Sequence, residues 1–444
     1  MSLIDQWLEN VASQVRIKRI RDVLTDELRD HILLQKADYV DEGMRESEAE
    51  KKAIADMGDA MVVGGELDRV HRPKVQWKGL LIALGMLVLG ILLQNVFLPE
   101  SESIHSAYGT KRLILTGISA AVIALFALTD YTFWIKMTIP AVGIWFICWW
   151  YRVNIMWDTS YINFGSIYDN LAILYPAIYI APEYLCLTMP VLTAFVIGSL
   201  RGRGWGAMIV SLILPMAAVY MTRLFSDTGY NYNAMLLMSL LGYVTVLLAV
   251  CGGFFRVNKR IACIITIVLM IYPAYLFAAD FMGIIKNIQP VITEELWPVL
   301  RQARFIGEGA ELTWIDEAVY NMIPYSNVLM VFAIHRFGWL PFGGFTVAIC
   351  ALLIYCHYKF VHMENKMGAL MGRTVTIVLS VQTFLYYLCS FTNYVDNMAL
   401  PLVSFGNTML VFDGILVGVI LSVLRGERLP EPAEVNRVSH SVFR

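Results

Sequence analysis

Charged residues are scarce in this sequence, which has 444 residues, of which 16% are charged and 58% are hydrophobic. A soluble domain carries about a quarter charged residues, so the composition excludes an ordinary soluble protein of this length. The charges are also unevenly placed, because residues 1–75 hold 28 of the 70 Lys, Arg, Asp and Glu side chains. The pattern predicts a charged N-terminal head that is joined near Pro73 to an apolar body.

The sequence also lacks a basic charge excess, a signal-peptide pattern and paired cysteine motifs. The formal net charge is −2, so there is no basic excess and no nucleic-acid partner is expected. Residues 1–30 contain no apolar run of the kind that a signal peptide needs, and no cleaved leader is expected. The seven cysteines show no C-x-x-C spacing. Neither a zinc site nor a disulfide framework is therefore predicted, and the cysteines are expected to serve as small apolar packing residues.

The head has the apolar spacing of a helical bundle. Apolar residues recur at helical intervals over Leu3–Val23 and over Leu24–Val40, which predicts two helices. Ser47, followed three residues later by Glu, has the pattern of a capping box, so a third helix is expected to begin there and to end at Gly58. A last short helix is expected over residues 60–71. Few large apolar side chains are available for a core, so the bundle is expected to be marginally stable by itself.

The body contains ten apolar segments, most of them near the roughly 20 residues that cross a bilayer. They run at about 78–98, 112–129, 133–151, 170–198, 207–223, 234–255, 261–284, 340–357, 374–392 and 403–424. Ten spans would put four clusters of Lys and Arg on one side: Arg201 and Arg203; Arg256, Lys259 and Arg260; Lys359, Lys366 and Arg373; Arg425 and Arg428. Because basic loops stay in the cytoplasm, both termini are predicted to be cytoplasmic.

The expected fold class is therefore all-α, a polytopic membrane protein of about ten transmembrane helices with a small cytoplasmic N-terminal helical bundle. The predicted parts are a head over 1–74, a membrane domain over 75–430 and a cytoplasmic tail over 431–444. A large extracytoplasmic loop is expected at about 285–340, with a helix over Met322–Phe337 lying on or dipping into the outer face. An aromatic belt at the outer interface is predicted for Trp145, Trp149, Trp150 and Tyr151.

Two segments of the head, Asp26–Ile32 and Ala53–Asp59, resemble the short prefix domain that precedes some Gram-positive permease-like proteins. The resemblance implies a role in regulation or partner contact, and it implies no chemistry.

The body resembles the SEDS family, the polytopic proteins of cell shape, elongation, division and sporulation, over residues 78–425. The strongest match is Leu400–Thr408, where L-P-L-V-S-F-G-N-T parallels the family pattern L-P-F-hydrophobic-S-Y-G-G-S. Gln382 matches a family glutamine in the preceding span, and Tyr325–Trp339 parallels H-T-D-F-I-F-A-V-I-x-E-E-L-G-F. Ile162–Gly165 resembles the entry to the family's fourth span. The number of spans and the long loop between spans seven and eight agree as well.

This resemblance implies a protein of the bacterial cell membrane that polymerises glycan strands from lipid II or another undecaprenyl-linked precursor. The family works beside a transpeptidase, a class B penicillin-binding protein, and in contact with membrane lipid. The reaction suits a carboxylate as general base. No resident cofactor is expected. A divalent cation is the one possible exception, because a cation can offset the charge of the diphosphate.

Several family positions carry a different residue here. The catalytic aspartate of H-T-D-F falls on Asn327, and an amide holds a sugar hydroxyl but takes no proton at neutral pH. The other changes are Asn170 for a glutamate, Ile173 for a lysine, His335 and Arg336 for two acids, and Tyr386 for an asparagine. The apolar frame persists while the polar positions change, which is typical of a paralogue that kept its fold and lost or altered its chemistry.

Each candidate site residue has an alternative. Asn327 is interpreted as a substrate-binding remnant or as an interface amide without a role. Asp316 and Glu317 are weak candidates for a replacement base, and otherwise are solvated loop acids. His335 and Arg336 suit a diphosphate or a lipid headgroup, or an interfacial pair. The candidate substrate-binding set is completed by Gln382, Ser404 and Asn170, with a tight turn as the alternative for Ser404.

Three functions remain open: a glycan polymerase, active or degenerate; a non-catalytic scaffold or regulator of wall synthesis; and a transporter of lipid-linked precursors. Whether the protein is an enzyme is undecided, because the catalytic position is Asn327. The substituted polar positions favour the scaffold. A transporter needs ionisable groups within the bilayer, and the apolar spans are interpreted as having almost none.

Overall fold

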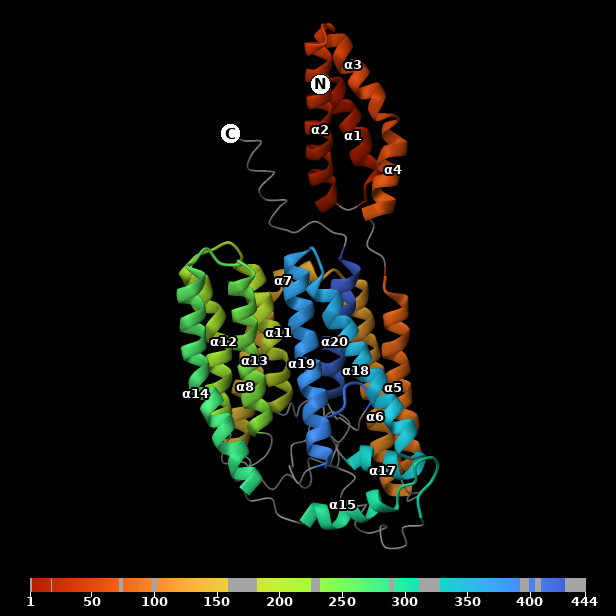
Figure 1. Cartoon of the computed structure of the whole chain (residues 1–444), viewed down its shortest axis with the longest axis vertical. Helices are drawn as coiled ribbons and strands as arrows, with labels where there is room; N and C mark the ends of the chain where they lie inside the picture. The colour runs from red at the N-terminus through yellow and green to blue at the C-terminus, as the bar shows by residue number, and fades with distance from the viewer. Residues whose placement is uncertain are drawn as a thin grey trace. The chain divides into compact units, whose positions relative to one another are not determined.

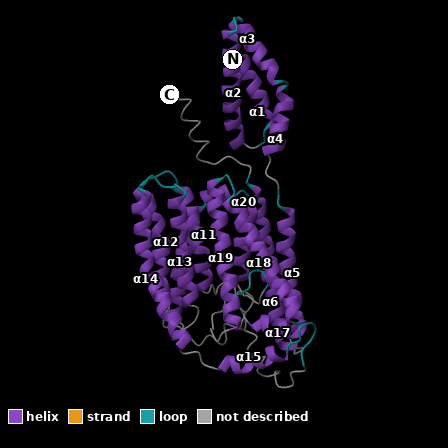
Figure 2. Ribbon diagram, in the orientation of Figure 1, coloured by secondary structure: helices purple, strands orange, loops and turns teal. Residues whose placement is uncertain are grey.

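The structure is a computed structural model that describes residues 2–16, 18–71, 75–97, 102–158, 182–224, 232–286, 291–310, 328–391, 399–403 and 409–427. Helices dominate this part of the chain and no strand occurs in it (Figure 2), so the all-α prediction is confirmed. The chain forms two compact units. Met1–Val75 makes up most of the first, and Gln76–Met363 with Gly368–Leu424 makes up the second (Figure 1).

Four helices lie in the described part of Met1–Val75: α1 (Leu3–Gln14), α2 (Lys18–Asp41), α3 (Glu46–Met57) and α4 (Ala60–His71). Their shared core consists of Ile4, Trp7, Leu8, Val11, Ile32, Ala53 and Ala60. The indole Nε1 of Trp7 donates a 3.0 Å hydrogen bond to the carbonyl oxygen of Gly58. The largest side chain of this core therefore keeps its one polar atom paired.

The helix boundaries in the head correct one prediction and confirm another. The first two helices separate between Gln14 and Lys18, not at residues 23–24. Val15 has an extended backbone, and its carbonyl oxygen accepts hydrogen bonds of 2.7 and 3.3 Å from the Arg21 guanidinium, which ends the first helix early. Gly58 ends α3 with φ +82°, as predicted, because glycine adopts this left-handed conformation without strain.

The capping box lies elsewhere than predicted. Ser2 and Asp5 form it at the start of α1, where the Ser2 hydroxyl accepts from the Asp5 backbone N–H at 3.1 Å and the Asp5 carboxylate accepts from the Ser2 backbone N–H at 3.3 Å. The predicted box at Ser47 is wrong, because α3 begins one residue earlier, at Glu46. Arg45 takes the N-cap position without a side-chain cap bond, and Lys36 of α2 lies 2.9 Å from the Glu46 carboxylate in the first turn.

Among the residues of the second unit that the structure describes, five helices are long and apolar enough to cross a membrane. They are Trp205–Arg223 in α12 (Trp205–Leu224), Ala234–Cys251 in α13 (Tyr232–Cys251), Lys259–Ala279 in α14 (Lys259–Lys286), Trp339–Val361, which is α18, and Lys366–Leu388 in α19 (Lys366–Phe391). Shorter apolar helical segments cover Trp77–Leu93, Leu113–Leu128, Thr138–Trp150 and Leu185–Ser199. The ten-span topology and the cytoplasmic placement of both termini stay predictions.

Large apolar side chains lie on the outside of this unit. On α14, Ile264, Ile271 and Tyr275 are 60%, 60% and 67% exposed, and on α18, Val347 and Ile354 are 68% and 69% exposed. A soluble monomer rarely presents continuous apolar faces of this kind to water. The outward faces suit lipid contact and agree with a multi-pass membrane protein.

One group of helices in the second unit surrounds α13, which packs against α11 (Pro182–Ser199), α12 and α14 (Figure 1). Gly242 makes the close approach possible, because a Cβ atom there would lie 2.6 Å from the Met189 sulfur and 3.0 Å from Pro215. The indole of Trp145 in α8 (Thr138–Asp158) donates a 3.0 Å hydrogen bond to the Leu185 carbonyl oxygen, which joins α8 to the same group.

A second group consists of α5 (Trp77–Phe97), α6 (Glu102–Leu128) and α20 (Met409–Arg425). Gly414 and Gly418 of α20 face α6, where a Cβ atom on either would lie 2.6 Å from Ser119 or Phe126. Small residues at this spacing allow two membrane helices to approach closely. The Ser119 hydroxyl uses that proximity and donates a 2.8 Å hydrogen bond to the Leu410 carbonyl oxygen.

The predicted span at 133–151 is divided into α7 (Tyr131–Lys136) and α8. Asp130 begins α7 by accepting a hydrogen bond from the Thr132 backbone N–H at 2.9 Å. The aromatic-belt prediction is wrong for Trp145 and Trp149, which are 3% and 0% exposed. Trp150 is 67% exposed and faces outward.

The region predicted as a loop at about 285–340 contains α15 (Val291–Gln302) and α17 (Val328–Phe337). The loop after α15 is bonded along the end of α17: the Gly309 N–H donates to the His335 carbonyl oxygen at 2.8 Å and the Gly307 N–H to the Phe337 carbonyl oxygen at 3.0 Å. The predicted helix over Met322–Phe337 is observed from Val328 onward, and its earlier part lies outside the described residues.

Candidate functional site

A buried carboxamide and a buried carboxylate meet where α19 and α20 approach each other. Gln382 of α19 is 0% exposed and Asp413 of α20 is 1% exposed. The Gln382 Nε2 atom donates a 2.8 Å hydrogen bond to Asp413 Oδ1 and a 3.1 Å hydrogen bond to the Ala399 carbonyl oxygen. The amide therefore joins α20 to the short turn that precedes it.

The second carboxylate oxygen holds that turn in an uncommon backbone conformation. Asp413 Oδ2 accepts a 3.3 Å hydrogen bond from the backbone N–H of Leu402. Leu402 has φ +62°, the only positive φ of a non-glycine residue in the described part of the chain. Such a conformation costs about 1–2 kcal/mol for a residue with a Cβ atom. The buried Leu402 side chain, packed with α5 and α6, and the hydrogen bond from its N–H offset this cost.

The pair has unused hydrogen-bonding capacity. Gln382 Oε1 is buried and has no hydrogen-bond partner among the described residues. No ion pair reaches Asp413 in that part of the chain either. A carboxylate in an apolar helical body is costly and is by default a functional-site hypothesis. Chemically, the pair can bind a proton or accept a hydrogen bond from a hydroxyl donor.

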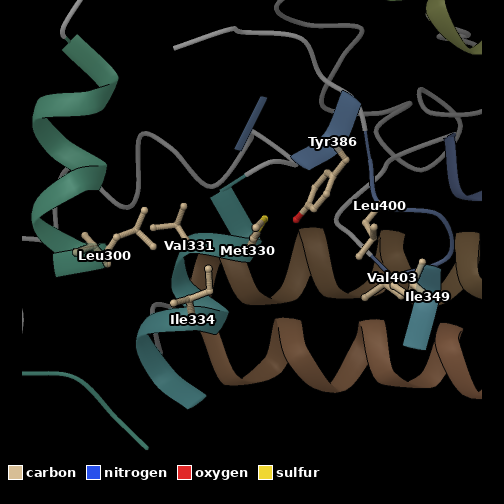
Figure 3. Close-up of a cluster of buried hydrophobic side chains, with 9 residues drawn as sticks. Leu300, Met330, Val331, Ile334, Ile349, Tyr386, Leu400 and Val403 are labelled. Atoms are coloured by element: carbon tan, nitrogen blue, oxygen red, sulfur yellow. The ribbon is translucent and has the colours of Figure 1, made fainter. Parts of the chain in front are cut away.

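An apolar cluster connects this site to the region between α14 and α18. The cluster contains Val299, Leu300, Met330, Val331, Ile334, Ile349, Tyr386, Leu400 and Val403. Figure 3 shows that α15, α17, α18, α19 and the turn at Leu400 each contribute side chains, and that the Tyr386 hydroxyl is directed toward Met330. Tyr386 lies four residues after Gln382, one helical turn along α19, so the polar pair and the cluster are neighbours.

Two of the predicted site residues lie at the end of α17 and already have protein partners. His335 is buried, and its Nε2 atom lies 3.1 Å from the Ala310 carbonyl oxygen. The Arg336 guanidinium forms an ion pair with Glu308, and both side chains are about half exposed. A diphosphate that binds Arg336 would compete with the Glu308 carboxylate for the guanidinium group.

Most of the other predicted site residues are not described by the structure. Among the substrate-binding set, only Gln382 belongs to the buried pair. Asn327, Asp316, Glu317, Asn170 and Ser404 lie outside the described residues. Nowhere in the described ranges do three or more His, Cys, Asp or Glu side chains gather as a metal site requires.

Asp413 was missed by the sequence reasoning, and the interpretation that the apolar spans hold almost no ionisable group needs this correction. The signal was present, since Asp413 is the only acid in α20, a helix otherwise made of apolar residues, glycine and one serine before its final arginine. Its partner Gln382 was singled out only through the family resemblance.

No family model matches the chain, and no curated protein matches it.

Proposed function

We propose that this chain is a SEDS-like membrane protein of cell-wall synthesis that binds a lipid-linked glycan precursor and has lost or altered the polymerising chemistry. One observation supports the proposal most: three separate sequence segments that carry the resemblance lie together in the second unit. They are the segment that includes α17, the Gln382 region of α19, and the turn that begins at Leu400.

The contacts between these segments are specific. Met330 and Ile334 of α17 pack in one cluster with Leu400 and Val403 of the turn. Gln382 bonds directly to the Ala399 carbonyl oxygen at 3.1 Å, immediately before that turn. This proximity agrees with the arrangement that the resemblance implies, and it supports the proposal to that extent.

The residue types favour binding over polymerisation. The position of the family's catalytic aspartate is Asn327, which lacks a proton-accepting oxygen at neutral pH but can hydrogen-bond a sugar hydroxyl. The Arg336 cation, nine residues further along the sequence, is paired with Glu308. A protein of this kind would hold the precursor beside a transpeptidase and act as a scaffold or regulator of wall synthesis.

The test is lipid II binding and polymerisation by the purified full-length protein in detergent, with wild type, Asn327→Asp and the control Asn258→Asp. Asn258 begins α14 by accepting backbone N–H bonds, a role that aspartate fills equally well. We expect wild type to bind lipid II without forming strands, and Asn327→Asp alone to recover strand formation.

Two results would change the proposal. Strands from wild type would mean that another acid replaces the missing base, and Asp316→Asn and Glu317→Gln would identify it. Absence of both binding and strands in all three proteins, with the transpeptidase present, would remove lipid II from the proposal.

A transporter of lipid-linked precursors is the second candidate, and it is favoured by one observation, the buried Asp413 with its partner Gln382. Intramembrane carboxylates are common in proton-coupled transporters. In proteoliposomes with an imposed pH gradient, translocation of a labelled precursor that is lost in Asp413→Asn would support this function. Equal translocation with and without the protein would remove it.

We also propose ten spans with both termini in the cytoplasm of a bacterial cell, supported by the four basic clusters and by the helix order. Reporter fusions test it. A periplasm-active phosphatase is expected to be active when fused after residue 306 and inactive after residue 74 or 444. An active fusion after residue 74 would contradict this topology.

A further inference from the structure

The connection between α13 and α14 brings together parts of the chain that the sequence separates. α13 ends at Cys251, and α14 begins at Lys259. The turn between them is fixed by backbone hydrogen bonds to the loop before α12: the Gly202 N–H donates to the Phe254 carbonyl oxygen at 2.9 Å, and the Arg256 N–H donates to the Arg203 carbonyl oxygen at 2.8 Å. The end of one helix and the start of the next are thereby held at a set distance.

Two thiols meet at this connection. Cys251 and Cys263 are twelve residues apart, and their thiol groups lie close enough to interact with each other. Both are free cysteines; Cys251 is exposed and Cys263 is partly exposed. A thiol pair in contact at an accessible helix end differs from a cysteine that only fills space inside a bundle.

A lysine completes the cluster. Lys259 lies one helical turn before Cys263, so the two side chains share a face of α14. Its Nζ atom donates a 3.3 Å hydrogen bond to the Cys251 carbonyl oxygen. The ammonium group is therefore held at the end of α13, on the face of α14 that also carries Cys263.

We propose that Cys251 and Cys263 form a redox-active dithiol that oxidises reversibly to an intramolecular disulfide and joins the ends of α13 and α14 covalently. The oxidant is a small two-electron acceptor, such as a diazene or a peroxide. Two S–H bonds break, one S–S bond forms, and two protons and two electrons pass to the oxidant; a diazene becomes a hydrazine. A dithiol reductant reverses the reaction.

The chain contains a matched control pair on α18. Cys350 and Cys356 are six residues apart on one helix, which separates them by about 9 Å along the axis. Two Cα atoms more than about 7 Å apart cannot be bridged without backbone movement. Oxidation is therefore expected at the α13–α14 pair and not at the α18 pair.

The experiment treats the purified full-length protein with diamide, blocks remaining thiols with a maleimide under denaturing conditions, and counts adducts by intact-mass and peptide mass spectrometry. Seven cysteines are present. We expect the adduct number to fall from seven to five, with peptides containing Cys251 and Cys263 linked to each other, and to return to seven after dithiothreitol. Phenylarsine oxide, which bridges two adjacent thiols, is expected to protect the same two residues.

Variants separate this result from general oxidation. Cys251→Ser and Cys263→Ser are each expected to keep all six remaining adducts after diamide, whereas the double variant Cys350→Ser, Cys356→Ser is expected to lose two of its five. Seven adducts on oxidised wild type, a loss of two from either single variant, or disulfide-linked dimers in place of the internal bond would each overturn the proposal.

Discussion

The two units of this protein distribute polar and apolar side chains in opposite ways. In the first unit, large apolar residues such as Trp7 and Ile32 are buried, and the charges lie outside. In the second, isoleucines and tyrosines of α14 face outward, while hydroxyl side chains are buried. Five buried examples, Ser211, Thr222, Ser239, Thr245 and Thr266, each donate to the carbonyl oxygen four residues earlier in their own helix.

This difference shows which surroundings each unit is built for. A hydroxyl that makes its hydrogen bond within its own helix needs no partner from water or from a neighbouring helix, which suits a bundle in lipid. The first unit relies on burial of apolar surface away from water. The same chain therefore uses two sources of stability, and each can be weakened separately.

The largest expected effect tests the first source. Ile32→Ala removes a fully buried side chain from the core of the head, and the cavity should lower the stability of that unit by about 3 kcal/mol. Hydrogen exchange of peptides from α1–α4 in the full-length protein measures it. Leu34→Ala, at a 67% exposed position of the same helix, is the control. Equal protection in the two variants would contradict a water-excluding core at Ile32.

The second effect tests the buried polar pair of the other unit. Asp413→Ala leaves the Gln382 Nε2 group without its 2.8 Å partner and the Leu402 N–H without an acceptor. Unsatisfied buried donors are costly, so a loss of about 2–3 kcal/mol is expected. Thermal unfolding in detergent measures the loss, and Asp413→Asn, which keeps an acceptor oxygen, should recover part of it. An unchanged melting temperature in Asp413→Ala would show that the pair has no structural role.

A smaller effect concerns helix contacts inside the second unit. At Gly418 an added Cβ atom would lie 2.6 Å from the Phe126 Cβ atom, so Gly418→Ala should separate α20 from α6 and cost about 1–2 kcal/mol. Gly343, in α18, has open space around a Cβ atom. Gly343→Ala should be neutral or slightly stabilising, since alanine is the better helix former. Similar melting temperatures for the two variants would remove the argument that α6 and α20 touch closely.

The smallest expected effect is a pH dependence of the head. The hydrogen bond from Lys36 lowers the pKa of Glu46 below its ordinary value of 4.5, and the same bond raises the pKa of Lys36 above 10.5. The stabilisation from Glu46 is present above pH 4.5 and is lost as the pH falls through the lowered pKa. That from Lys36 is complete below pH 10.5 and is lost as the pH rises through the raised pKa.

The pair therefore contributes between about pH 4.5 and 10.5, and only weakly, because exposed ion pairs are screened. Hydrogen exchange at the start of α3 should quicken slightly below this window in wild type. Glu46→Gln should remove the dependence, while Glu48→Gln, in the same turn, should retain it. A dependence that persists in Glu46→Gln would assign it to another group.

The sequence indicates the two residues of the candidate site separately, but it does not indicate their contact. Gln382 was identified by resemblance, and Asp413 was visible as a single acid in an apolar helix, but nothing local to either residue indicates that they bond to each other. They are 31 positions apart, and a hydrogen bond between separate helices depends on how those helices pack. The resemblance positions at Asn327, Asp316, Glu317, Asn170 and Ser404 remain predictions.

The sequence by itself determined the helical class and the presence of helices suited to a membrane, because hydropathy and helical periodicity are properties of short segments. Only the tertiary structure shows that Lys36, on another helix, pairs with Glu46 in the first turn of α3. It also decided that Cys251 meets Cys263 and that Asp413 meets Gln382. These pairings depend on turn geometry and on helix packing. The number of residues between two positions in the sequence does not reveal whether packing brings them together.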